Sequence, residues 1–154
     1  MHKVNYRGKY FAVEGPLNLS RSVQGRPVLY TAGRSQTFMD HATSYTDGVF
    51  THGSTLEETV AIADELRKQL VVKGRRPEDF IVSVSQNPIV GSTEQEAQEK
   101  YMELLRFIPN TSLSRPLFFG SAEKVADQVQ QWYDQGAIDM LILRQDHPHG
   151  LRDL

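Results

Sequence analysis

The chain has 154 residues, no cysteine and a formal net charge of -2 at neutral pH, with 39% hydrophobic residues. These values are typical of one globular domain, and they exclude disulfide bonds and thiol chemistry. They also argue against disorder and against a nucleic-acid-binding surface. No apolar run approaches the roughly 20 residues of a membrane span, and no signal-peptide apolar region opens the chain. We therefore expect a cytoplasmic protein that binds neither nucleic acid nor membrane.

Residues 1–25 are predicted to form an extended segment ahead of the first strand of the core. Aromatic and small residues alternate with Lys9 and Phe11, and Gly-Pro at 15–16 marks a turn, which together indicate a short ribbon.

A strand, a small-residue turn and a helix start follow at residues 27–45. The turn is Ala32-Gly33-Arg34-Ser35. Gly33 lets the backbone approach a ligand, Ser35 can cap the helix, and the N–H groups of a first helical turn favour an anion. Arg34 adds a cation. An ordinary strand-to-helix turn with a capping serine explains the same residues.

Three more strands and three more helices are expected. We predict strands over 48–52, 80–90 and 138–143, helices over 54–74, 93–107 and 121–136, and a loop over 109–116. The first of these helices has a capping box, Ser54 with Glu57 or Thr55 with Glu58, and ends at Gly74. Together with the helix that follows Ser35, this makes four predicted helices, each with an apolar face. In chain order these faces consist of Phe38, His41, Ala42 and Tyr45; Leu56, Val60, Ala63, Leu66 and Leu70; Ala97, Tyr101, Leu104 and Leu105; and Val125, Ala126, Val129, Trp132 and Tyr133. The basic residues of 73–76 are assigned to a helix end.

Several polar residues are weaker site candidates. Polar residues 85–87 end the third strand, where barrel enzymes place ligand groups, although a turn explains them equally. His52 follows the second strand and is read as a loop residue. His147 and His149 lie two residues apart in the tail, and without a fixed carboxylate they are too few for a metal site.

The alternation of strands and helices predicts right-handed βαβ units and one parallel sheet. The fold class is therefore α/β, with four βα units that resemble half of a TIM (β/α)8 barrel. We treat residues 1–154 as one partial-barrel domain with its core over 26–146 and a tail over 147–154. Half a barrel leaves two open edges and an exposed apolar face, so we expect a homo-oligomer. Two copies related by a twofold axis would supply eight strands; the alternative is that the faces are covered in another way or by a different partner.

Segments along almost the whole chain resemble one family. In order they are EGPLNLSRSVQGRP at 14–27, RPVLYTAGRSQTFMDHA at 26–42, DGVFT at 47–51, GRRPEDF at 74–80, PIVGSTEQEA at 88–97 and GSAEKVADQVQQWYDQGAIDMLIL at 120–143. They are similar to segments of the luciferase-like, FMN-dependent monooxygenases, in particular the nitrilotriacetate and dibenzothiophene-sulfone monooxygenase group.

The chain departs from that family in two ways. It resembles only the C-terminal half of the barrel, whereas the N-terminal strands contribute much of the flavin and substrate pocket, and the family's long segment near 98–119 is shortened. Locally, a family Gln is Thr31 here, and a family Gly is Phe38, which places a bulky side chain near the expected phosphate.

The resemblance implies a monooxygenase component that uses reduced FMN from a separate reductase to oxygenate a small organic substrate. By the same resemblance, Ala32, Gly33, Arg34 and Ser35 form the phosphate-side turn, and no catalytic base is assigned. Two alternatives remain open. The chain is either a non-catalytic homologue that binds FMN or another phosphate ligand, or a remnant that only self-associates.

Overall fold

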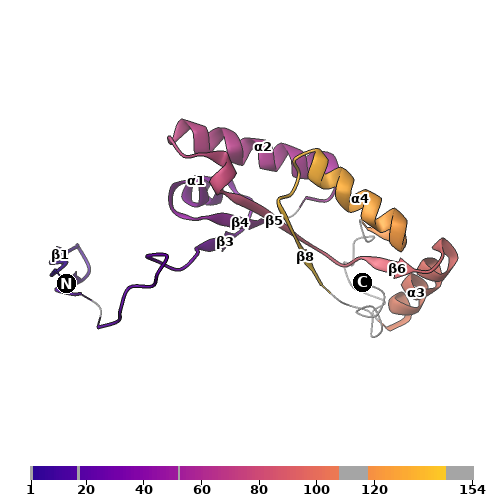
Figure 1. Ribbon diagram of the computed structural model, residues 1–154, viewed down its shortest axis with the longest axis horizontal. Coiled ribbons are helices and arrows are strands. Elements are labelled where there is room, and N and C mark those ends of the chain that lie inside the picture. The colour runs from indigo at the N-terminus through magenta and orange to yellow at the C-terminus, as the bar shows by residue number, and fades with distance from the viewer. Residues whose placement is uncertain (1, 17, 52, 108–117, 145–154) are drawn as a thin grey trace.

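The computed structural model describes residues 2–16, 18–51, 53–107 and 118–144 (Figure 1). Its centre is a parallel four-stranded sheet in the order β3-β4-β5-β8, which confirms the predicted parallel sheet. The strands of this sheet are β3 (Tyr30–Ala32), β4 (Gly48–Thr51), β5 (Ile81–Gln86) and β8 (Met140–Leu143). The helices are α1 (Gln36–Tyr45), α2 (Leu56–Val72), the short 3-10 helix η1 (Pro77–Asp79), α3 (Glu94–Phe107) and α4 (Ala122–Asp134).

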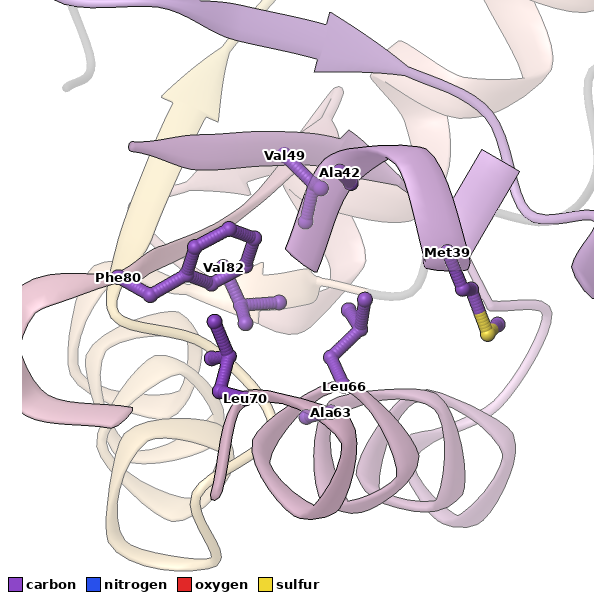
Figure 2. Close-up of a cluster of buried hydrophobic side chains, with 8 residues drawn as sticks. All are labelled: Met39, Ala42, Val49, Ala63, Leu66, Leu70, Phe80 and Val82. Atoms are coloured by element: carbon purple, nitrogen blue, oxygen red, sulfur yellow. The ribbon is translucent and has the colours of Figure 1, made fainter. Parts of the chain in front are cut away.

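One face of this sheet is covered by helices and contains the core. Val49 of β4 and Val82 of β5 are fully buried against Leu66 and Leu70 of α2, as Figure 2 shows. Further along the sheet, a second cluster joins Val84 of β5 to α4 and includes an edge-to-face ring pair, Phe118 with Trp132, at 5.2 Å. Since side chains alternate along a strand, the intervening residues lie on the opposite face, which none of the described helices covers.

The start and the end of α2 follow the sequence prediction. The Thr55 side chain accepts a hydrogen bond from the Glu58 backbone N–H at 3.1 Å, so the Thr55 and Glu58 alternative is the one that forms. Gly74 follows the last turn with φ +71°, a conformation that glycine adopts without steric cost. The predicted face of α2 is also confirmed, because Ala63, Leu66 and Leu70 are fully buried.

The prediction of one strand over 80–90 is wrong. Strand β5 ends at Gln86, and Pro88, which has no N–H to give to a ladder, separates it from β6 (Ile89–Gly91). Strand β6 pairs in parallel with β7 (Phe119–Ser121) in a separate two-stranded sheet, which the sequence pattern did not predict. Helix α3 packs on this sheet, and its buried residues Ala97 and Leu104 form one cluster with Ile89 of β6.

The prediction of the buried face of α1 is also partly wrong. His41 and Tyr45 are exposed and pack on each other with their ring centroids 5.2 Å apart. The buried residues are Met39, Ala42 and Thr43. Burial of Thr43 is tolerated because its hydroxyl donates to the Met39 carbonyl oxygen at 2.7 Å.

In α4, Val125 and Trp132 are buried as predicted, whereas Ala126 and Tyr133 lie on the exposed side.

Two of the basic residues of 73–76, Lys73 and Arg75, serve the end of α1, whereas Arg76 binds Asp79. Lys73 Nζ lies within 2.6 to 2.8 Å of the Asp40 carbonyl and carboxylate oxygens and of the Thr43 and Ser44 hydroxyls. Arg75 donates to the carbonyl oxygens of Thr43 and Thr46. These cations satisfy C-terminal carbonyl groups of a helix, which is a structural role.

Two aspartates stabilise the N-terminal edge of the sheet, each by accepting a backbone N–H bond from a neighbouring segment and binding an arginine. Asp47, just before β4, accepts from the Leu29 N–H at 2.8 Å and binds the Arg26 guanidinium. Asp139, just before β8, accepts from the Val82 N–H at 2.8 Å and from Arg67 at 3.2 Å. This edge is therefore built for stability.

The N-terminal residues form a ribbon that projects from the rest of the molecule (Figure 1). Strands β1 (Tyr6–Arg7) and β2 (Ala12–Val13) pair antiparallel, which confirms the predicted ribbon. Among the described residues, no helix is long and apolar enough to cross a membrane.

Candidate functional site

The turn predicted to bind an anion lies at the C-terminal end of β3. Gly33 has φ +150° and donates its N–H to the Phe50 carbonyl oxygen of β4 at 3.2 Å. Ser35 is the N-cap of α1, and its hydroxyl accepts from the Phe38 N–H at 3.2 Å. The four residues Ala32, Gly33, Arg34 and Ser35 are all exposed. The predicted residues therefore lie together at one accessible turn.

The start of α1 presents free backbone donors. No described residue accepts a hydrogen bond from the N–H groups of Arg34, Gln36 or Thr37. Such groups, with the positive end of the helix dipole, attract an anion. The N-terminus of α2 lies at the same edge, where the backbone N–H of Glu57 itself and the Thr55 hydroxyl lower the pKa of the Glu57 carboxyl.

Arg34 forms an ion pair with Glu58, a contact that the sequence did not predict. Its guanidinium lies 3.3 Å from Glu58, whose other carboxylate oxygen accepts from the Ser54 N–H at 2.6 Å. Both charged side chains are exposed, so the pair is weak and a stronger anion can compete for Arg34. Glu58 was predicted only as a capping residue, because sequence spacing does not show which strand ends are neighbours.

Phe38 does lie next to the turn, as the sequence comparison predicted. A Cβ atom built on Gly33 would lie 2.9 Å from the Phe38 ring. The ring also packs against the core cluster of Met39, Ala42 and Val49. Any larger residue at position 33 would therefore clash with the Phe38 ring.

The polar end of β5 lies along the same edge of the sheet. The strand register aligns Ala32 of β3 with Phe50 of β4 and Phe50 with Ser83 of β5. Ser85 follows Ser83 by two residues, so it lies on the same helix-free face, closer to the C-terminal end of β5. The Ser85 hydroxyl is shielded from solvent and has no hydrogen-bond partner among the described residues. The Thr51 hydroxyl, at the end of β4, is likewise shielded from solvent and has no hydrogen-bond partner among the described residues. Thr51 was missed, although a polar residue ending an apolar strand was a usable signal.

No metal site forms in the part of the chain that the structure describes. No three His, Cys, Asp or Glu residues gather there as a metal would require. His52, His147 and His149 lie outside the described residues.

Comparison with known proteins identifies relatives of this arrangement. The profile of the family described as luciferase-like monooxygenase matches residues 1–115. The chain is 38% identical over 104 residues to N-acetyl-S-(2-succino)cysteine monooxygenase of Bacillus subtilis, an alignment that covers 68% of this chain and 24% of that enzyme. It is 33% identical over 109 residues to nitrilotriacetate monooxygenase component A of Aminobacter aminovorans, covering 71% of this chain and 24% of that enzyme.

The fold is similar to that of a solved member of this group. The crystal structure of long-chain alkane monooxygenase superposes with a TM-score of 0.81 at 27% identity, covering 97% of this chain and 43% of that one. The prediction of a partial TIM-like barrel is thus confirmed. The chain spans less than half of that structure, and its alignments span about a quarter of the curated relatives.

Proposed function

The chain belongs to the luciferase-like monooxygenase family, and from that premise we propose that it is an FMN-dependent monooxygenase component. In this proposal it uses reduced FMN from a separate reductase to oxygenate a small organic substrate. The observation that carries the proposal is the Gly33 turn. An exposed turn with free backbone donors and an arginine lies at the sheet edge where α/β barrels bind ligands.

The turn has the donors that a phosphate group needs. The N–H groups of residues 34, 36 and 37 and the Arg34 guanidinium would hold the phosphate of FMN, with Ala32 and Gly33 allowing close approach and Ser35 fixing the helix start. Bound FMN supplies the oxygen chemistry, and the protein orients the cofactor and excludes water. The Ser85 hydroxyl, unsatisfied in the described structure, provides a further polar group on the helix-free face.

The partner in this proposal is a flavin reductase, which would supply the reduced FMN. One relative is named as component A of its monooxygenase, which supports a system of several proteins. The relatives carry the names of different substrates, so the class proposed here is only that of small organic molecules.

An alternative function is binding without catalysis. The observation that favours it is Phe38, whose bulky ring lies beside the Gly33 turn that would hold the phosphate. In this alternative the chain binds FMN or another phosphate ligand, or only self-associates. In either function we propose a homodimer.

Titration of FMN with the full chain, followed by flavin fluorescence, tests the proposal. We expect Arg34→Gln to weaken FMN binding by about tenfold or more, because a charge-assisted hydrogen bond to phosphate is lost. Riboflavin, which lacks the phosphate, should bind the wild type and Arg34→Gln equally. Equal FMN affinity in the wild type and Arg34→Gln would place the phosphate elsewhere.

Ser35→Ala separates binding from folding, with Ser121→Ala as its matched control. Ser121 caps α4 as Ser35 caps α1, through a 3.3 Å bond from the Lys124 N–H, so both variants lose one cap. Only Ser35→Ala should weaken FMN binding. Oxygen uptake that requires both reductase and substrate would then distinguish catalysis from binding alone.

A further inference from the structure

Glu58 joins the start of α2 to the candidate turn through the two oxygens of its carboxylate. One oxygen accepts from the Ser54 N–H at 2.6 Å, and the Glu58 N–H donates to the Thr55 hydroxyl at 3.1 Å, which together form a capping box. The other oxygen lies 3.3 Å from a guanidinium nitrogen of Arg34. The helix cap therefore fixes the carboxylate beside Arg34 independently of any ligand.

The ion pair between Glu58 and Arg34 is long and single. Bonds from arginine to a carboxylate normally measure about 2.7 to 2.9 Å, and Arg26 binds Asp47 through two bonds of 2.5 Å. A guanidinium has five N–H donors, and the contact with Glu58 uses one of them. The side chains of Arg34 and Glu58 are 55% and 41% exposed. Arg34 can therefore leave Glu58 at little cost when a stronger acceptor is present.

The backbone next to Arg34 offers donors to the same acceptor. The N–H groups of residues 34, 36 and 37 donate to no described residue, and Arg34 contacts no described carboxylate other than that of Glu58. A phosphate monoester carries close to two negative charges at neutral pH, whereas a carboxylate carries one. A phosphate held by these N–H groups would therefore draw on the guanidinium that Glu58 holds, and Glu58 would repel it.

We propose that Glu58 competes with the phosphate of FMN for Arg34, and that it thereby weakens flavin binding and speeds flavin release. This inference rests on the proposed function, in which the flavin is reduced on a separate protein and has to be exchanged with it. An arginine and a helix start without an opposing charge would hold the phosphate for longer. The fixed carboxylate of Glu58 takes Arg34 back as the phosphate leaves, which lowers the barrier to release.

Replacing Glu58 with glutamine in the full chain tests this competition. Glutamine keeps an oxygen that can accept from the Ser54 N–H, so the cap of α2 should survive, and urea unfolding checks this. Flavin fluorescence gives the dissociation constant, and stopped-flow mixing gives the dissociation rate. We expect Glu58→Gln to bind FMN about three- to fivefold more tightly, mainly through slower dissociation, since an exposed ion pair changes an equilibrium by up to about this factor. Riboflavin, which lacks the phosphate, should bind both proteins equally.

Glu57→Gln is the matched control. Glu57 lies in the same first turn of α2, is exposed, and forms no ion pair within the described part of the chain. Its replacement removes the same charge from the same helix start, and because solvent and salt screen that charge, FMN affinity should change by less than about twofold. A double variant, Arg34→Gln with Glu58→Gln, completes a mutant cycle. Without Arg34 there is no cation to compete for, so Glu58→Gln should then have little effect.

The possible results separate this inference from the proposed function. If Arg34→Gln weakens FMN binding while Glu58→Gln leaves it unchanged or weakens it, the phosphate lies at the turn and the competition is refuted. Weaker binding in Glu58→Gln would mean that Glu58 orients Arg34 toward the phosphate. Equal tightening in Glu57→Gln would also overturn the competition, because any charge at the start of α2 would then have the same effect. If Arg34→Gln leaves FMN affinity unchanged, or the wild type binds no FMN, the proposed phosphate site fails and the competition fails with it.

Discussion

Replacing Asp47 with asparagine tests whether the N-terminal edge of the sheet stabilises the fold. Asp47 receives two hydrogen bonds of 2.5 Å from Arg26 and one of 2.8 Å from the Leu29 N–H. These donors lower the pKa of Asp47 from 3.8 to about 2, with the Arg26 hydrogen bonds as the largest cause. Asparagine keeps the shape of the side chain and removes its charge.

The size and the sign of the effect follow from this pKa. At about 1.36 kcal/mol for each pH unit, the difference between the ordinary and the lowered pKa corresponds to at most ~2.4 kcal/mol. The Arg26 side chain is 54% exposed and the Asp47 side chain is 26% exposed, so solvent screening reduces this to about 1 kcal/mol. Because the pKa is lower in the folded state, this stability is present above about pH 4 and is lost as the pH falls toward 2.

Urea unfolding followed by circular dichroism, at fixed protein concentration, measures the difference. At pH 7 we expect Asp47→Asn to be less stable than the wild type by about 1 kcal/mol, and the two proteins should converge near pH 2. Asp79→Asn is the control, because the Arg76 and Asp79 pair is more exposed and should matter less. Equal stability at pH 7, or a difference that persists unchanged at pH 2, would refute the reasoning.

Two further variants test the packing that positions the site. Leu66→Ala removes a fully buried side chain from the first core cluster, so we expect a loss of about 3 to 4 kcal/mol in the free energy of unfolding, measured with urea; a loss below about 1 kcal/mol would contradict the described core. Lys73→Met removes the ammonium group that joins α2 to Asp40, Thr43 and Ser44 of α1. Amide hydrogen exchange should accelerate in α1 and stay unchanged in α4, whereas uniform acceleration would show that the contact is not local.

The sequence predicted elements whose signals are local. Capping by Thr55 and Ser121 and the stop at Gly74 depend on residues within one helical turn, and the apolar period of α2 depends on one helix. The candidate turn at Ala32–Ser35 was found in the same way, from a strand, a glycine and a capping serine in succession.

Tertiary structure decided the features that depend on distant partners. Strand β6 pairs with β7, about 30 residues further along the chain, and a three-residue strand has too little pattern to reveal that pairing. Arg34 binds Glu58 only because β3 and β4 are neighbours, and His41 is exposed because α1 turns Met39 and Thr43 toward α2 and the sheet. Local periodicity gives each element its apolar residues, and the packing of the elements selects which of them are buried.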